Sequence, residues 1–234
     1  MREQISFVDA ILVACVALYA LALGLDLPAA FQPSGMLNFL SPSSESLYKL
    51  GMGGLIPLLN GQWWTPLTAT YLHASVFHIL FNMLWLRQLG PLVENLFGPS
   101  RFIMIYTAAG ICGSLLSALV GRTPFFVGAS GAIFGLFAAL IYYGIRRGGT
   151  FGSAIFRQML VWSVIGLVLG FTRSGVDNLG HIGGLLGGAV MAAILGFQER
   201  KRQQLVHHLG ALVTLAGIGV CFVMMVVFFF SGTR

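Results

Sequence analysis

The chain has 234 residues, of which 57% are hydrophobic and only 9% are charged. A water-soluble domain of this length could not cover its surface with so few charges, so the composition excludes a soluble globular protein. The formal net charge of +6 comes from basic residues scattered at the ends of apolar runs, which indicates membrane topology rather than nucleic-acid binding. The sequence therefore predicts an all-α, polytopic membrane protein.

Seven apolar runs approach the roughly 20 residues that a helix needs to cross a bilayer. In chain order they cover about 8–27, 75–93, 101–120, 130–146, 153–172, 178–197 and 206–230. The first run is long enough to span and shows no cleavage site, so we interpret it as a span rather than a signal peptide. The long connection 28–74 is rich in proline yet partly apolar, which favours an interfacial structure lying partly in the membrane.

Positive charge predicts the orientation, because cytoplasmic loops of membrane proteins are enriched in Lys and Arg. With the N-terminus inside, the outer side carries four of these residues: Lys49, Arg122, Arg173 and Arg234. The inner side carries nine: Arg2, Arg87, Arg101, Arg146, Arg147, Arg157, Arg200, Lys201 and Arg202. We therefore expect a cytoplasmic N-terminus and an external C-terminus, with the basic run 198–204 as a cytoplasmic anchor.

Four polar residues lie inside or at the start of predicted spans, where ionisable groups are expensive and usually functional. His78 and Asn82 lie early in the second span, Ser130 opens the fourth, and His181 lies early in the sixth. These three spans run in the same direction, and each residue is within about two turns of the outer end. We expect the four side chains to meet at one depth.

Their chemistry suits hydrolysis of an amide. The hydroxyl of Ser130 becomes a nucleophile only when a base takes its proton, and His181 can do this near neutral pH. His78 and Asn82, four residues apart on one helical face, can both donate hydrogen bonds to an oxyanion. The backbone N–H of Ser130, at a helix N-terminus, is a third donor.

Glycines recur at spacings of four on the fourth and sixth spans, at Gly131 and Gly135 and at Gly180, Gly184 and Gly188. Such small-residue stripes let membrane helices approach closely, which would bring Ser130 to His181. The three cysteines, Cys15, Cys112 and Cys221, fall within apolar runs and are interpreted as packing residues. We expect no metal and no cofactor.

Taken together, these motifs resemble those of the rhomboid family of intramembrane serine proteases. The stretch GASG at 128–131 resembles the nucleophile motif, HASVFHILFN at 73–82 the second-span motif, and GHIGGLLGG at 180–188 the helix that bears the base. Leu89, Gly90 and Glu94 agree as well, and the resemblance covers roughly residues 60–195.

The resemblance implies a six-helix proteolytic core at 1–197, followed by a basic linker and a seventh helix at 198–234. It implies a Ser–His dyad without an acid, with Ser130 as nucleophile and His181 as base. The oxyanion hole would comprise His78, Asn82 and the Ser130 amide. Gly128, Gly131, Phe134, Gly184 and His73 would be structural residues near the site. The protein would lie in the cell membrane and cleave peptide bonds in or near transmembrane segments of other proteins. The scissile bond would lie in an extended stretch with small side chains, and the substrate would enter laterally beside the fifth span.

Two residues near the site have simpler interpretations than catalysis. Asp177, just before the sixth span, is expected to cap the helix rather than complete a triad. His73, five residues before His78, is expected to point away from it and to hold the loop onto the second span. The oligomeric state stays open.

Three departures from the family pattern concern Thr65, Phe134 and Gly180. Thr65 follows Trp64 where the family often has arginine, Phe134 stands where many members have tyrosine, and Gly180 replaces the usual alanine. The first would alter how the loop is anchored, and the second keeps an aromatic ring but loses its hydroxyl.

Other functions fit less well. An inactive rhomboid-like protein that only binds membrane clients would usually lack the serine or the histidine. A transporter or channel would favour charged residues along a pathway, and the spans hold no acid or lysine near their middle. An H-E-x-x-H metalloprotease motif is absent from the sequence, and the aspartates lie near span ends.

Overall fold

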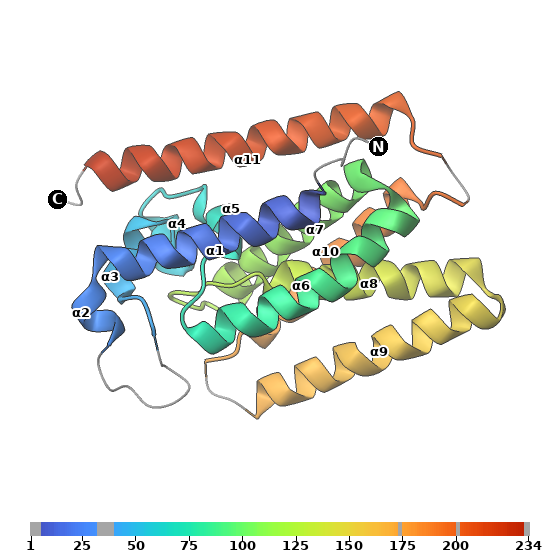
Figure 1. Ribbon diagram of the computed structural model, residues 1–234, viewed down its shortest axis with the longest axis horizontal. Coiled ribbons are helices and arrows are strands. Elements are labelled where there is room, and N and C mark those ends of the chain that lie inside the picture. The colour runs from blue at the N-terminus through green and yellow to red at the C-terminus, as the bar shows by residue number, and fades with distance from the viewer. Residues whose placement is uncertain (1–5, 32–39, 173–174, 200–201, 232–234) are drawn as a thin grey trace.

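Long helices packed side by side make up most of the protein, as Figure 1 shows for this computed structural model. The structure describes residues 6–31, 40–172, 175–199 and 202–231. Within these ranges the long helices are α1 (Phe7–Leu25), α6 (Val76–Phe97), α7 (Pro99–Leu115), α8 (Ser130–Arg147), α9 (Gly149–Phe171), α10 (Asn178–Leu195) and α11 (Leu205–Ser231). A π-helical turn, η3 (Leu116–Val120), continues α7. The predicted all-α fold is confirmed.

In the described part of the chain, six helices are long and apolar enough to cross a membrane: α1, α6, α7 with its continuation, α9, α10 and α11. The fourth predicted span is also a helix at the expected place, α8, but it is less apolar than the other six. It begins at Ser130 and ends at Arg147, and it packs against α6, α7, α9 and α10. Because protein rather than lipid covers most of α8, it needs less apolar surface. The chain is a multi-pass membrane protein.

The described parts of the predicted connection, 28–31 and 40–74, form short helices joined by turns. These are α2 (Leu27–Ala30), α3 (Ser44–Lys49), α4 (Leu55–Leu59), α5 (Thr65–Thr68) and the 3₁₀ turn η2 (Ala69–Tyr71), which cluster at one end of the bundle (Figure 1). Leu47, Leu50 and Leu72 from this region are buried together with Ala22 of α1. The part from residue 40 onward is therefore packed against α1.

Aromatic contacts tie this region to α11. Phe228 contacts the rings of Trp64 and Tyr48, with centroids 5.9 and 5.8 Å away, and Phe222 lies 5.2 Å from Tyr71. These ring contacts pack the short-helix region against α11.

Glycines bring the central helices α7, α8 and α10 into backbone contact. A Cβ added at Gly188 would lie 2.3 Å from the carbonyl oxygen of Gly135, and one at Gly113 would lie 2.5 Å from that of Gly180. No side chain fits at such distances, so the predicted stripes are where the helices meet.

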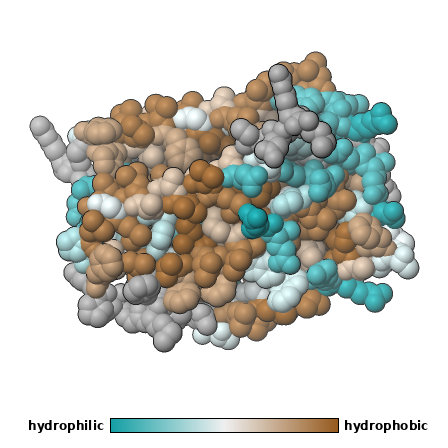
Figure 2. Space-filling view, in the orientation of Figure 1, coloured by the Kyte–Doolittle hydropathy of each residue, from teal (hydrophilic) through white to brown (hydrophobic). Residues whose placement is uncertain are grey.

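Hydrophilic surface gathers at the end of the bundle that carries the start of α1 and the α8–α9 turn, whereas apolar surface covers much of the visible face (Figure 2). At this polar end, Arg147 forms an ion pair with Glu199 at 3.2 Å. The buried guanidinium of Arg101 donates to the carbonyl oxygens of Phe97 and Arg202, both at 3.1 Å, which joins α7 to the segment before α11.

Candidate active site

Ser130 and His181 are in contact. The Ser130 hydroxyl lies 3.0 Å from Nε2 of His181, although 51 residues separate them in the chain. Ser130 is the first residue of α8, and His181 lies one turn into α10. The two side chains can therefore form the hydrogen bond that a nucleophile and its base require.

The chain before Ser130 is held by backbone hydrogen bonds, which fixes the position of the serine. Phe126 and Gly53 form an antiparallel bridge, with N···O distances of 2.8 and 3.1 Å. Gly128 donates its N–H to the carbonyl oxygen of Ala69 at 2.9 Å and has φ +134, a conformation that favours glycine. The stretch before α8 is thus held by backbone hydrogen bonds to Gly53 and Ala69.

His78 approaches the serine through Gly128. A Cβ at Gly128 would lie 2.7 Å from Nε2 of His78 and 3.9 Å from the Ser130 hydroxyl, so the imidazole edge occupies the space that this glycine leaves. Nδ1 of His78 accepts the backbone N–H of Ala74 at 3.4 Å. Because Nδ1 is an acceptor, the proton of neutral His78 is on Nε2, the atom that faces Gly128.

Asn82 lies one turn further along α6 and is buried. Its Nδ2 donates to the backbone carbonyl of His78 at 2.9 Å. A side-chain amide has two N–H groups, so one of them is still available to another acceptor.

The imidazole of His181 is held on two sides. Phe134 stacks on it with a centroid distance of 4.2 Å and an interplanar angle of 12°. Nδ1 of His181 lies 3.3 Å from Oδ1 of Asn178, a residue that the sequence analysis did not single out. The sequence could have indicated Asn178, because a polar side chain three residues before His181 lies on the same helical face.

Asp177 caps α10, as predicted. Its carboxylate accepts the backbone N–H of Gly180 at 2.9 Å. This is the hydrogen bond that an N-cap residue makes, and it satisfies one otherwise free donor of the first turn.

The expectation that His73 points away from His78 is wrong. The two rings meet edge to face with centroids 5.2 Å apart. The expectation assumed helical spacing, but α6 begins only at Val76 after the cap Ser75, so His73 lies in the turn before the helix. Burial, with a contribution from His78, holds the pKa of fully buried His73 well below its ordinary value, so His73 is neutral at physiological pH.

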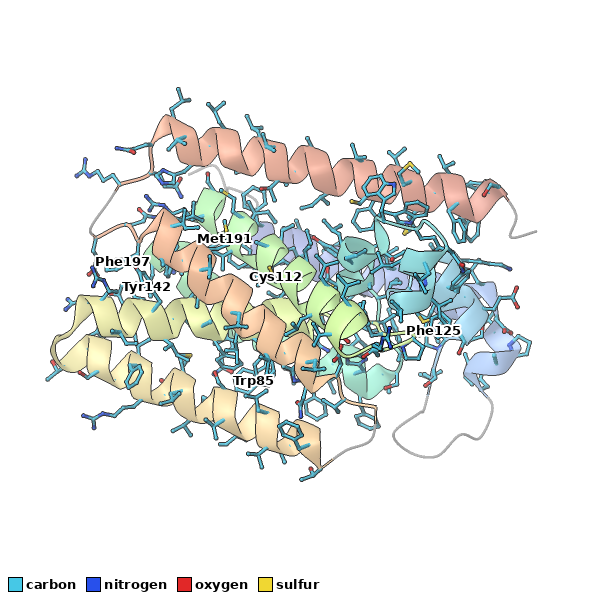
Figure 3. The ribbon with its side chains drawn as sticks, turned by 180° about the vertical axis from the view of Figure 1, so that it is seen from behind. Trp85, Cys112, Phe125, Tyr142, Met191 and Phe197 are labelled. Atoms are coloured by element: carbon cyan, nitrogen blue, oxygen red, sulfur yellow. The ribbon has the colours of Figure 1, made fainter. Side chains whose placement is uncertain are left out.

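An open groove of about 580 Å³ runs along α6 beside α9 and is lined by Phe81, Leu84, Trp85, Arg87, Gln88 and Trp162. Trp85, labelled in Figure 3, contacts Trp162 of α9 and Phe137 of α8, each with a centroid distance of 5.2 Å. Among the residues that the structure describes, no group of three or more His, Cys, Asp or Glu side chains could hold a metal ion.

These features define a multi-pass helical membrane protein in which glycine-mediated helix contacts place a serine against a histidine. The Rhomboid domain model matches residues 60–198, more than half of the chain. The chain belongs to the rhomboid family.

Several curated proteins are similar to this chain. Rhomboid protease GluP of Bacillus subtilis is 41% identical over 163 residues, which cover 70% of this chain and 32% of GluP. RHOMBOID-like protein 7 of Arabidopsis thaliana is 36% identical over 158 residues, 67% of this chain and 50% of that protein. Inactive RHOMBOID-like protein 8 of the same plant is 30% identical over 186 residues, 78% of this chain and 53% of that protein. The chain thus spans about a third to a half of these relatives.

Proposed function

We propose that the protein is an intramembrane serine endopeptidase that hydrolyses peptide bonds in or near transmembrane segments of other membrane proteins. The observation that carries the proposal is the 3.0 Å contact between the Ser130 hydroxyl and Nε2 of His181. Membership of the rhomboid family and the similarity to Rhomboid protease GluP support it.

In the proposed mechanism His181 Nε2 takes the proton of Ser130 as Oγ attacks the scissile carbonyl carbon. The resulting imidazolium then gives this proton to the leaving amine, and an acyl-enzyme remains on Ser130. Water then attacks the ester as the same Nε2 takes its proton. The imidazolium returns this proton to Oγ as the ester C–O bond breaks, which releases the new carboxyl end and restores the serine.

The negative charge of each tetrahedral intermediate requires fixed donors. The N–H of Ser130 is at the start of α8, where no preceding turn can accept it, and the helix dipole favours an anion there. Nε2–H of His78 borders the same space across Gly128, and Asn82 retains one free N–H. We propose that these three groups form the oxyanion hole, and each donor is worth about 10²–10³ in rate.

We propose that substrates reach Ser130 laterally, between α6 and α9. Four of the six side chains that line the groove are apolar, and Trp85 of α6 contacts Trp162 of α9. α9 lies at the edge of the bundle (Figures 1 and 3), where it packs mainly against α8. Its apolar side chains Val168 and Phe171 are exposed. A transmembrane segment with an extended stretch and small side chains at the scissile bond would fit this route.

We propose that residues 1–197 form the proteolytic core and that 198–234 add the linker and α11. The protein would lie in the cell membrane with a cytoplasmic N-terminus and with its polar end, where α1 begins, facing the cytoplasm (Figure 2).

An inactive rhomboid-like protein is the main rival, because one relative carries that description. The pairing of Ser130 with His181 favours the active alternative, since a client-binding protein has no need of a hydroxyl held against an imidazole.

Labelling with a fluorophosphonate probe tests the proposal. The purified parent protein should react, whereas Ser130→Ala and His181→Ala should not, because the first lacks the nucleophile and the second lacks the base. Ser163→Ala is the matched control: this buried serine on α9 donates to the carbonyl oxygen of Met159 and should not affect labelling. Equal labelling of the parent and Ser130→Ala would refute the proposal.

A further inference from the structure

Two glycines of α9 receive side chains from the centre of the bundle. A Cβ at Gly166 would lie 2.8 Å from Cζ of Phe134, and one at Gly170 would lie 2.1 Å from Oδ1 of Asn178. The two glycines are four residues apart and share one face of the helix. The inner face of α9 is therefore shaped to accept these two side chains.

Both of these side chains contact the imidazole of His181. Phe134 stacks on the ring, and Oδ1 of Asn178 lies 3.3 Å from its Nδ1. The position of α9 thus bears on the orientation of His181, although α9 itself packs mainly against α8 and has few contacts with α10.

A backbone carbonyl of α9 determines which way the Asn178 amide faces. Nδ2 of Asn178 donates to the carbonyl oxygen of Leu167 at 3.2 Å. A carbonyl can only accept, so the NH₂ group must face Leu167 and the amide oxygen must face His181. Nδ1 of His181 then has to carry the proton, which leaves Nε2 as the acceptor that a general base needs toward Ser130.

We propose that Asn178 is a positioning residue that fixes the tautomer and orientation of His181, and that α9 controls it through the carbonyl of Leu167. The inference rests on the proposed function, in which His181 is the base. Asn178, a neutral residue, then occupies the place that an acid has in a catalytic triad. The cleavage rate depends on the position of α9, because α9 orients Asn178.

Other charged or titratable groups near His181 do not replace this contact. Asp177 precedes the same helix, but its carboxylate is engaged by the N–H of Gly180. His78, on α6, faces the Gly128 side of the site. Within the described residues, Asn178 is the side chain whose hydrogen bond to Nδ1 the structure shows.

The test compares Asn178→Ala and Asn178→Asp with the parent, in the full chain reconstituted in lipid vesicles with a cleavable membrane-protein substrate. Asn178→Ala should lower kcat by about 10- to 100-fold with little change in KM, because the tautomer is no longer fixed. Asn178→Asp keeps an acceptor for Nδ1, so it should recover much of the rate. Its added negative charge stabilises the imidazolium and should move the acidic limb of the pH–rate profile to higher pH.

Gly170→Ala provides a second route, because the new methyl group would displace Asn178 without altering it. It should reduce kcat in the same direction as Asn178→Ala. Gly217→Ala on α11 is the matched control, since no atom lies within 4 Å of a Cβ at that position, and it should behave as the parent.

A spectroscopic measurement separates this inference from the proposed function. NMR of the ¹⁵N-histidine-labelled parent should show His181 protonated at Nδ1 when neutral, and Asn178→Ala should show a mixture of tautomers, whether or not the protein cleaves anything. Unchanged tautomers in Asn178→Ala would overturn the inference. A parent-like kcat of Asn178→Ala would also overturn it, provided that Ser130→Ala abolishes cleavage. If the parent neither labels nor cleaves, but Asn178→Ala still changes the tautomer of His181, only the proposed function would be overturned.

Discussion

The carbonyl oxygen of Gly131 lies against Gly184, where an added Cβ would be only 1.9 Å away. Gly131 follows Ser130, and Gly184 is three residues after His181. The contact between these two glycines therefore sets the separation of α8 and α10 at the level of the candidate dyad.

Gly184→Ala should separate Ser130 from His181. The methyl group would push a backbone carbonyl rather than a flexible side chain, and overpacking of this kind costs about 1–3 kcal/mol. We expect slower fluorophosphonate labelling and a lower unfolding temperature in detergent. Gly219→Ala, whose Cβ would meet nothing within 4 Å, should match the parent in both measurements. Parent-like labelling of Gly184→Ala would show that the dyad tolerates a wider spacing.

Phe134 is buried between His181 and Gly166, so its ring supports the imidazole even without the hydroxyl that many family members have. Phe134→Ala should destabilise the fold by about 3–5 kcal/mol and slow labelling, because a large buried ring is lost. Phe134→Leu keeps most of the volume but not the stacking. It should unfold close to the parent temperature while labelling more slowly. Equal labelling of Phe134→Leu and the parent would mean that volume alone supports His181.

Substitutions at Asp177 distinguish a helix cap from a catalytic acid. Asparagine caps helices as well as aspartate does, so Asp177→Asn should retain both labelling and stability. Asp177→Ala should lose about 1 kcal/mol of stability with the loss of the hydrogen bond to Gly180. The measurements are the labelling rate and the denaturation midpoint. A large loss of labelling in Asp177→Asn with an unchanged midpoint would argue for a triad.

Phe228 and Phe230 provide a matched pair on α11. Phe228 contacts Tyr48 and Trp64 of the short-helix region, whereas Phe230 is 79% exposed. Phe228→Ala should release this region from α11 and increase the rate of limited proteolysis within residues 44–71. Phe230→Ala should leave the rate unchanged. Similar cleavage rates in the two variants would show that α11 does not hold the short helices.

The sequence was sufficient for features that depend on local pattern. Apolar length predicted where the long helices lie, because crossing a bilayer requires about 20 residues whatever the neighbouring helices do. Helical spacing placed His78 and Asn82 on one face of α6, and the shared direction of three spans predicted that Ser130 would meet His181. The cap at Asp177 followed from its place before an apolar run.

Only the tertiary structure decided contacts that depend on where one helix begins or on a partner distant in the chain. The start of α6 at Val76 turned His73 toward His78 against expectation. The carbonyl of Leu167, on another helix, fixed the Asn178 amide and with it the proton on His181. Hydropathy and periodicity describe how a segment meets its solvent, whereas hydrogen-bond direction at the site depends on atoms that folding brings from elsewhere.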